Sequence, residues 1–460
     1  MGPLFCGRSI GVRRRKIHIK TFGCQMNEHD SSKVLEILGR YPYEETTDLH
    51  EADLVFVNTC TVRQKAEQKA YSTLGRLKRL KQEKEVIIGV GGCLAQQKGV
   101  DLLDRFAHLD FVVGTHNLHR LPDVIEDVQH TGNRWCETCF RDRAPSMEVM
   151  PRGRTRVQAY VTIMQGCDNF CSYCIVPMVR GPERSRPSLQ ILDEVRRLAE
   201  GGVKEIILLG QNVNSYGKGL EGEMTFPAFL RAVSRVEGIR RIRFTTSHPK
   251  DLSLDLITCF RDLPKLCEHL HLPFQSGSNR VLKAMNRGYT REVYMEKVDR
   301  LREACPTMAI TADVLVGFPG EGEKDFEDTM DLIEGVRFDG LFSFRYSARE
   351  GTAAAGFPGQ IPEALKAQRL KVLQERQRAI TRSKNEEMVG RTERVLVEGK
   401  SHKNPRDMMG RTRTNRIVNF PGDGRFVGEE IWVRIVTGFA NSLRGEAICS
   451  HPLVRAVGDL

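Results

Sequence analysis

The sequence has no apolar run that approaches the roughly 18–20 residues needed to span a bilayer, so we expect no membrane-spanning segment. The start of the chain also lacks the order of a secretory signal, because Arg13, Arg14 and Arg15 follow the apolar residues instead of preceding them. An Arg-rich start without acidic residues fits a disordered basic tail over residues 1–15 or a short organelle-targeting segment, and we expect the tail.

The chain also lacks the cysteine density of a small secreted scaffold. Its 13 cysteines are spread over 460 residues, whereas disulfide-rich secreted domains are short. Reduced thiols that serve metal sites fit this distribution better, and they predict a cytoplasmic protein.

Acidic residues are outnumbered by basic ones, 59 against 70, which gives a formal net charge of +11. This excess favours a polyanionic partner, nucleic acid before a membrane surface. Hydrophobic and charged contents of 40% and 28% are ordinary for a globular protein, and the length predicts two to four domains at roughly 100–200 residues each.

Three cysteines, Cys167, Cys171 and Cys174, follow the apolar run 160–164 at spacings of four and three residues. One short loop at a strand end can place three sulfurs around one inorganic centre. A structural zinc site takes four protein ligands, and a closed iron–sulfur cluster takes four cysteines, so three cysteines leave one iron open to bind another molecule. The alternative is half of a zinc site completed from elsewhere, and the spacing favours the cluster.

The N-terminal third alternates apolar strands with amphipathic helices, which predicts an α/β domain with a doubly wound parallel sheet over residues 16–128. Its expected strands are 17–22, 53–58, 86–90 and 111–114.

A second group of cysteines, Cys24, Cys60 and Cys93, lies at the carboxyl ends of three of these strands, each just ahead of a helix. Parallel strands bring those ends to one edge of the sheet, where open α/β sheets bind ligands. Helix N-termini also favour thiolate over thiol. The pattern predicts a second three-thiolate site, and three buried, inert cysteines are the alternative.

A polar, Arg-rich segment, which we interpret as a linker over 129–152, precedes the central part of the chain. It contains Cys136 and Cys139, which we take as thiols without a set function, although a Cys-x2-Cys pair can also be half of a zinc site or a redox pair.

Six strand–helix units over residues 153–387 predict a partial parallel (β/α)6 barrel with its chemistry at the carboxyl ends of the strands. After the strand before Cys167, the expected strands are 205–209, 242–246, 268–273, 309–316 and 341–346. Polar segments follow them, including Ser247 and His248, and His248 is as compatible with a structural as with a catalytic role. Three further cysteines lie in or beside apolar elements and are expected to pack in the core: Cys259, Cys267 and Cys305.

After a long charged helix over 362–388, short β-like runs separated by turns predict a small antiparallel barrel over 388–455. The predicted nucleic-acid contacts on it are Lys400, Lys403, Arg411, Arg413 and Arg416. A solvated charged face is the alternative interpretation.

The Cys-x3-Cys-x2-Cys arrangement at 167–174 resembles that of the radical S-adenosylmethionine (SAM) enzymes. Segments 21–27, 58–63 and 91–93 resemble the N-terminal domain of one group of them, the methylthiotransferases, and the last domain with segment 441–446 resembles their OB-like TRAM domain. The resemblance covers about residues 16–452.

The resemblance implies two [4Fe–4S] clusters with three cysteine ligands each. The cluster on Cys167, Cys171 and Cys174 would bind SAM at its open iron and cleave it to a radical. The auxiliary cluster would lie on the trio Cys24, Cys60 and Cys93, and SAM would serve as radical source and methyl donor. The resemblance also implies cofactor-binding residues after the barrel strands: Gln211, Asn212, Gln275, Ser276 and Gly317.

Residues 25–27 (Gln-Met-Asn) and 61–63 (Thr-Val-Arg) resemble the methylthiotransferases that modify C2 of N6-isopentenyl(dimethylallyl)adenosine next to the anticodon of tRNA. The same chemistry on N6-threonylcarbamoyladenosine or on a ribosomal-protein aspartate is the alternative, and a zinc-containing RNA-binding protein without catalysis is a third. We expect a monomer that binds tRNA and receives electrons from a donor such as a flavodoxin or ferredoxin.

Overall fold

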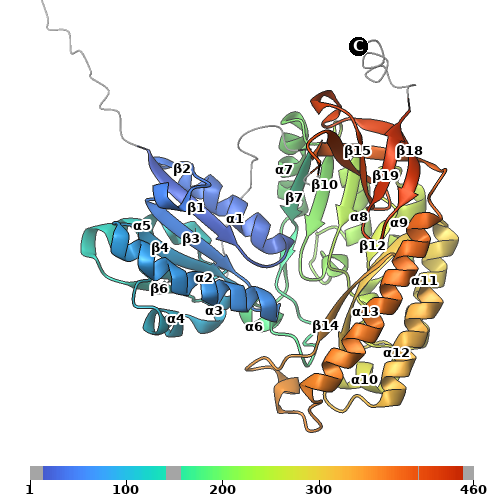
Figure 1. Ribbon diagram of the computed structural model, residues 1–460, viewed down its shortest axis with the longest axis horizontal. Helices are drawn as coiled ribbons and strands as arrows, with labels where there is room; N and C mark the ends of the chain where they lie inside the picture. The colour runs from blue at the N-terminus through green and yellow to red at the C-terminus, as the bar shows by residue number, and fades with distance from the viewer. Residues whose placement is uncertain (1–13, 141–156, 402–403, 449–460) are drawn as a thin grey trace, which may run out of the picture. The chain divides into compact units, whose positions relative to one another are not determined.

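The structure is a computed structural model that describes residues 14–140, 157–401 and 404–448 (Figure 1). The chain divides into two compact units. Of the described residues, the N-terminal unit contains 14–140 and 178–181, and the C-terminal unit contains the others. Nearly all of the predicted basic tail, the second half of the predicted linker, and Lys403 lie outside the described residues.

The N-terminal unit contains a sheet of six parallel strands in the order β2-β1-β3-β4-β5-β6. The inner strands β3 and β5 contain continuous apolar runs because helices cover both faces of the sheet. The strands are β1 (Arg15–Thr21), β2 (Tyr43–Glu45), β3 (Leu54–Thr59), β4 (Ile87–Gly92), β5 (Phe111–Val113) and β6 (Trp135–Glu137).

Side chains of β3 alternate between two hydrophobic clusters, one on each face of this sheet. Leu54 and Phe56 pack with helices α1 (Gln25–Leu38) and α5 (Leu121–Thr131). Val55 and Val57 pack with the helices on the opposite face, which are α2 (Gln64–Glu83), α3 (Cys93–Lys98) and α4 (Val100–Arg105). The predicted doubly wound sheet is therefore confirmed.

Two short strands, β2 and β6, were not predicted from the sequence. β6 pairs with β5 in parallel register and contains Cys136, and α5 extends to Thr131. Residues 129–137, which we interpreted as the start of a linker, thus belong to the helix and edge strand of this sheet. Three-residue edge strands carry too little periodicity to be detected from sequence.

The C-terminal unit begins with six parallel strands that follow one another in sequence order. β7, β10 and β11 form one sheet and β12, β13 and β14 another, and a parallel bridge between Ile242 and Leu266 lies where the two sheets adjoin. This is the predicted partial barrel. The strands are β7 (Gln158–Thr162), β10 (Glu205–Leu209), β11 (Arg241–Phe244), β12 (His269–His271), β13 (Ala309–Val316) and β14 (Gly340–Arg345).

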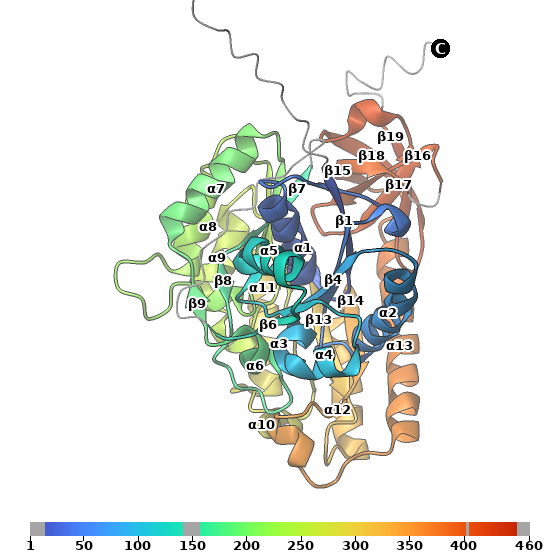
Figure 2. The same cartoon turned by 90° about the vertical axis from the view of Figure 1, so that its left-hand side faces the viewer.

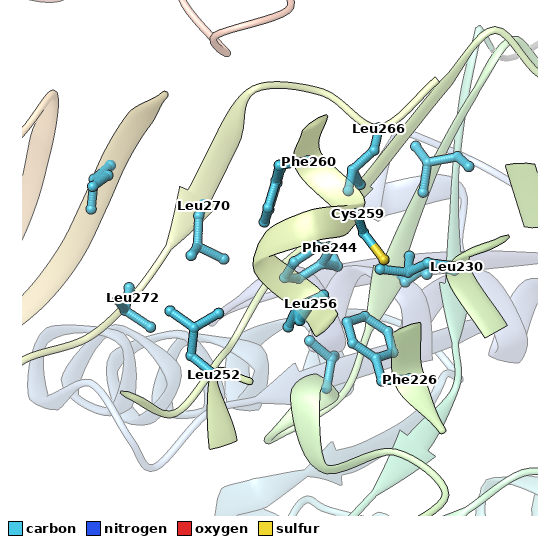
Figure 3. Packing of buried hydrophobic residues seen from close by; sticks show 14 of the residues in the cluster. Phe226, Leu230, Phe244, Leu252, Leu256, Cys259, Phe260, Leu266, Leu270 and Leu272 are labelled. Carbon is cyan, nitrogen blue, oxygen red and sulfur yellow. The ribbon is translucent and has the colours of Figure 1, made fainter. Parts of the chain in front are cut away.

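Helices alternate with these strands, and they bury one continuous hydrophobic core against the sheet. Figure 3 shows part of it, where Phe226, Leu230 and Phe244 surround Cys259. Cys267 and Cys305 are also buried, so the expected packing role of these cysteines is confirmed. The helices are α7 (Ser188–Glu200), α8 (Phe226–Ser234), α9 (Leu254–Asp262), α10 (Asn279–Ala284), α11 (Arg291–Ala304) and α12 (Glu323–Val336).

A long helix, α13 (Glu363–Glu386), carries the chain from the partial barrel to the last domain. With 24 residues it is the longest described helix, and it is densely charged. In the ranges that the structure describes, no helix is both long and apolar enough to cross a membrane.

The last domain is a closed barrel in the strand order β15-β16-β17-β19-β18, drawn in red in Figure 2. Its neighbouring strands are antiparallel except β17 and β19, which pair in parallel, so the predicted antiparallel barrel contains one exception. The strands are β15 (Thr392–Lys400), β16 (Asp407–Thr412), β17 (Ile417–Pro421), β18 (Glu430–Gly438) and β19 (Leu443–Ala447).

This small barrel is bound to the amino ends of the central strands. Arg241, the first residue of β11, is fully buried and donates to Glu430 at 2.6 Å and to the carbonyl oxygens of Arg411 and Arg394 at 2.7 and 2.9 Å. Arg243 donates to the carbonyl oxygen of Thr412 at 2.8 Å. The carboxyl ends of the same strands, where barrel enzymes place their chemistry, lie at the opposite edge.

We expect Arg241→Met to lower the free energy of unfolding of the C-terminal unit by about 3 kcal/mol, because the buried Glu430 carboxylate loses this partner. Urea unfolding of the full chain, followed by circular dichroism, measures the change. The control is Arg196→Ala, whose ion pair with Asp193 is exposed and should contribute less than about 1 kcal/mol. Equal losses in the two variants would contradict a stabilising role for the buried pair.

Candidate metal and cofactor sites

The structure brings Cys24, Cys60 and Cys93 to one edge of the N-terminal sheet, as predicted. They follow β1, β3 and β4, which are neighbouring strands, and Cys24 and Cys93 stand at the starts of α1 and α3. The strand order reverses between β1 and β3, and such switch points are where open α/β sheets bind ligands. Cys24 is close enough to contribute to the raised pKa of both Cys60 and Cys93.

Two buried asparagines hold the first two cysteine loops together. Asn27 donates to the side chain of Asn58 at 3.1 Å and to the carbonyl oxygen of Thr59 at 3.0 Å. Asn58 donates back to the carbonyl oxygen of Asn27 at 2.8 Å. The Asn27 side-chain oxygen accepts from both the backbone nitrogen and the thiol of Cys24 at 3.4 Å. The Gln-Met-Asn motif therefore includes a residue that fixes the position of Cys24 relative to Cys60.

The same edge requires glycine at close approaches of the backbone. Gly23 has φ +136°, and a Cβ placed on it would lie 2.8 Å from the Cβ of Cys60 and would also meet Asn27. Gly92 has φ +91°, and a Cβ there would lie against the backbone of Thr59. The hydroxyl of Thr59 donates to the carbonyl oxygen of Gly91 at 2.6 Å, which links the second loop to the third.

A buried arginine that the sequence analysis missed lies beside this trio. Arg180 pairs with Asp30 at 2.7 Å and neighbours Cys93, and residues 178–181 are part of the N-terminal unit. Burial raises the pKa of Cys93 to about 12, and the Arg180 guanidinium opposes that rise. Burial and the nearby Cys24 raise the pKa of Cys60. No local pattern in the sequence marks Arg180, because the residues that it contacts are distant in the chain.

In the C-terminal unit, Cys167, Cys171 and Cys174 lie in the loop after β7 and the short β8 (Met164–Gln165), which is the carboxyl edge of the partial barrel. The turn after α10 holds this loop in place. Ser172 donates to the carbonyl oxygens of Met285 and Ala284 at 3.1 and 2.8 Å, and Asn286 donates to that of Phe170 at 3.1 Å.

The thiols of this second trio are in electrostatic contact with one another. Burial, with Cys171 as the next contribution, raises the pKa of Cys174 to about 12, and burial also raises that of Cys167. Arg287 donates to the sulfur of Cys171 at 3.4 Å. All six cysteines are free thiols. Metal binding at Cys60, Cys93, Cys167 and Cys174 must therefore displace protons that burial stabilises.

In the described part of the chain, no three His, Cys, Asp or Glu side chains converge on one point at the separations of ligands to a single metal ion. The donor chemistry of each trio, three buried or half-buried thiols on loops fixed by hydrogen bonds, fits a cluster that takes three cysteines.

The five predicted cofactor-binding residues have mixed environments. Gln211 accepts from the backbone nitrogen of Gly166 at 2.6 Å and so supports the cysteine loop. The hydroxyl of Ser276 is buried near that of Thr329 at 3.5 Å. A Cβ on Gly317 would meet the side chain of Lys366, so packing alone accounts for this glycine.

Three buried polar atoms after β10 and β11 have no hydrogen-bond partner in the described residues: the Asn212 Oδ1, the Ser247 Oγ and the His248 Nε2. Buried polar atoms are nearly always paired, so these three mark a place where a polar ligand fits. The other His248 nitrogen accepts from the backbone of Lys250 at 3.2 Å. Desolvation lowers the pKa of His248 to about 2, so its imidazole is neutral.

The backbone is strained at the same edge. Thr246 after β11 has φ +70°, and Gln275 after β12 has φ +66°. A β-branched residue rarely adopts this conformation, and strained residues cluster at functional sites. The strain at Gln275 therefore supports its predicted place at the cofactor site better than any contact of its side chain does.

All three arginines predicted to bind nucleic acid form ion pairs with carboxylates of the same chain. Arg413 donates to Glu268 at 2.8 Å, Arg416 pairs with Asp339 at 2.5 Å, and Arg411 pairs with Glu398 at 3.0 Å. Glu268 and Asp339 directly precede β12 and β14, so Arg413 and Arg416 attach the small barrel to the central domain. Their charges are paired within the chain, which the sequence does not show, and their contact with nucleic acid stays a prediction.

Lys400 is exposed at the end of β15 and remains a predicted RNA contact. Of the Cys-x2-Cys pair, Cys136 packs at the edge of the hydrophobic cluster under α2, and Cys139 is exposed.

Comparison with known proteins follows the same three-part organisation. The family described as Uncharacterized protein family UPF0004 matches residues 16–114, the Radical SAM superfamily matches 161–333, and the TRAM domain matches 386–448. A protein of Syntrophus aciditrophicus named tRNA-2-methylthio-N(6)-dimethylallyladenosine synthase is 52% identical and covers 97% of both chains. This chain belongs to the tRNA methylthiotransferase family.

Proteins of the same name from Syntrophobacter fumaroxidans and Geotalea uraniireducens are 51% and 52% identical, over 94% and 95% of this methylthiotransferase and 96% and 99% of their own chains. Among solved structures, the radical SAM methyltransferase TsrM from Kitasatospora setae is 14% identical, covers 72% of each chain and has a TM-score of 0.54. That likeness concerns the fold. Membership of this enzyme family excludes the interpretation as a non-catalytic zinc protein.

We expect Gly23→Ala to destabilise the N-terminal unit by at least about 1 kcal/mol, because the new Cβ forces an unfavourable φ and meets Cys60 and Asn27. Thermal unfolding of the full chain measures the change. Gly75→Ala is the control, since its Cβ would point into open space on α2, and it should stabilise the helix by roughly 0.5–1 kcal/mol. A neutral Gly23→Ala would show that this approach is not tight.

His248 also predicts how stability depends on pH. Its folded pKa is about 2 and its ordinary value is 6.5, so the unfolded chain binds the extra proton between these limits and stability falls as the pH drops below about 6.5. Relative to wild type, His248→Asn should therefore gain about 2 kcal/mol in free energy of unfolding between pH 7 and pH 5. Urea unfolding at both pH values tests this, with the exposed His50→Asn as control. Parallel pH profiles for wild type and His248→Asn would refute a neutral, buried imidazole.

Proposed function

We propose that this methylthiotransferase adds a methylthio group to C2 of N6-dimethylallyladenosine next to the anticodon of tRNA, by radical SAM chemistry. The observation that supports this most strongly is the near-complete match to proteins that bear the name of that activity. The Gln-Met-Asn and Thr-Val-Arg motifs agree with it, and Asn27 has a defined position at the first cysteine.

The proposed radical site is the loop of Cys167, Cys171 and Cys174, whose three thiols would hold a [4Fe–4S] cluster. Bound there, such a cluster supplies the electron that cleaves SAM. Hydrogen bonds hold the loop at two places. Gln211 accepts from Gly166 just before the first cysteine, and Ser172, between the second and third cysteines, donates to the carbonyl oxygen at the end of α10. Buried loop hydrogen bonds of this kind keep the open coordination position in one place.

The SAM cofactor would lie at the carboxyl edge of β10 and β11. The unpaired Asn212 Oδ1 can accept a hydrogen bond from the amino or hydroxyl groups of SAM. The unpaired Ser247 Oγ can also donate one to the SAM carboxylate. Because Nδ1 of the neutral His248 accepts from Lys250, its Nε2 carries the proton and can donate one hydrogen bond without adding charge. Gln275 and Ser276, which follow β12, remain proposed contacts of SAM.

The proposed auxiliary site is the trio Cys24, Cys60 and Cys93, where a second [4Fe–4S] cluster would supply the sulfur that is transferred. The chain fixes these thiols through the Asn27–Asn58 pair and the hydroxyl of Thr59, and the buried Arg180 provides positive charge beside Cys93. SAM would also provide the methyl group.

We further propose that tRNA binds to the terminal TRAM domain, with Lys400 as one contact. Reductive cleavage of SAM needs an external electron, so a donor such as a flavodoxin or ferredoxin is the second proposed partner. We also propose that the chain acts as a monomer.

Mass spectrometry of tRNA nucleosides tests the substrate. Cells that lack the gene should lose 2-methylthio-dimethylallyladenosine and accumulate its unthiolated precursor, and the wild-type gene should restore it. If the methylthio derivative of threonylcarbamoyladenosine disappears instead, the assigned substrate is wrong although the chemistry stands.

The cysteine trios predict two separable defects. Replacing Cys167, Cys171 and Cys174 with Ala should abolish formation of 5′-deoxyadenosine from SAM. Replacing Cys24, Cys60 and Cys93 with Ala should leave SAM cleavage but stop thiolation of tRNA. Anaerobic assays with chromatographic detection of both products, together with iron and sulfide analysis of each variant, measure the effects. Normal SAM cleavage in both triple variants would refute this division of labour.

A further inference from the structure

Arg287 lies in the turn after α10, and only 5% of its surface is exposed. Each of its three nitrogens donates a hydrogen bond. The acceptors are the sulfur of Cys171 at 3.4 Å, the carbonyl oxygen of Pro273 at 2.9 Å and the hydroxyl of Tyr289 at 3.1 Å. The guanidinium is therefore held rigidly against one cysteine of the proposed radical site.

The charge of Arg287 has no carboxylate partner among the described residues. Five arginines are buried among the described residues, and the four other than Arg287 each pair with a buried carboxylate. Those pairs are Arg180 with Asp30, Arg241 with Glu430, Arg243 with Glu205, and Arg369 with Glu321. The groups around Arg287 are instead phenols, thiols and the neutral His248.

A buried cation without a counter-charge is costly, and proteins retain one where a ligand supplies the missing negative charge. Thiolates and the iron–sulfur core that they would bind are such a charge, and Cys171 is already in hydrogen-bond contact with the guanidinium.

We infer that Arg287 is a positioning residue for the cluster on Cys167, Cys171 and Cys174, and that the negative charge of the loaded site is its counterion. This inference rests on the proposed ligand set. Hydrogen bonds to cluster sulfurs and nearby positive charge favour the reduced, more negative state. Arg287 therefore raises the reduction potential of the cluster and slows its loss.

The test compares Arg287→Met and Arg287→Lys in the full chain in which Cys24, Cys60 and Cys93 are replaced with Ala, so that one cluster is observed. The control is Arg300→Met, since Arg300 pairs with Glu296 on the surface of α11. The cluster is reconstituted anaerobically. Its midpoint potential, its electron paramagnetic resonance spectrum and the rate of iron loss to a chelator are then measured, along with thermal unfolding with and without iron.

We expect the midpoint potential of Arg287→Met to shift to more negative values, and iron loss to accelerate about tenfold or more. Arg287→Lys, which keeps the charge, should be intermediate, and Arg300→Met should match wild type. The thermal destabilisation by Arg287→Met should be larger in the iron-loaded chain than in the iron-free chain, because only the loaded chain loses a charge pair.

An unchanged potential and iron-loss rate in Arg287→Met, or equal destabilisation with and without iron, would overturn the inference and make Arg287 an ordinary structural donor. Should Arg287→Met fail to fold, the same measurements on Arg287→Lys decide the question. Full tRNA thiolation by Arg287→Met in the chain that keeps all six cysteines would leave the proposed function standing. A wild-type chain without a cluster on these cysteines would refute both.

Discussion

Parallel pairing of strands is the constraint on which the candidate sites depend. In both units every strand of the main sheet runs in the same direction, so the loops that follow the strands share one edge. Cys24, Cys60 and Cys93 come from three such loops, and Cys167 to Cys174 from another. If any one of these strands ran in the opposite direction, the cysteines that follow it would lie at the opposite edge of the sheet.

In the C-terminal unit, buried charges have different partners at the amino and at the carboxyl ends of the central strands. At the amino ends of the strands, arginines find carboxylates, and these pairs attach the small barrel. At the carboxyl ends, Arg287 donates to the sulfur of Cys171. The Asn212 Oδ1, Ser247 Oγ and His248 Nε2 atoms have no hydrogen-bond partner among the described residues. Buried polar atoms are nearly always paired, so the three unpaired atoms at this edge are consistent with the proposed cofactor site.

The sequence predicted both cysteine trios because strand, thiol and helix lie close together along the chain, where periodicity reveals them. It also predicted the parallel sheet and the six-unit partial barrel. Its failures have a common cause. Strands β2 and β6 are too short to show a period, and the partners of Arg413 and Arg416 are more than 70 residues away. Nothing local distinguishes a surface arginine from one that pairs with a distant carboxylate.

The sequence by itself determined at which strand ends the six cysteines stand, because local patterning sets strands, helices and the loops between them. That these cysteines bind metal stays a prediction from the same pattern. Only the tertiary structure decided which charges are paired. Arg180, on the short helix Val176–Arg180, forms an ion pair with Asp30. Arg287 donates to the sulfur of Cys171 and has no carboxylate partner among the described residues. The physical reason is that the cost of burying a charge depends on its surroundings in space, and folding alone sets those surroundings.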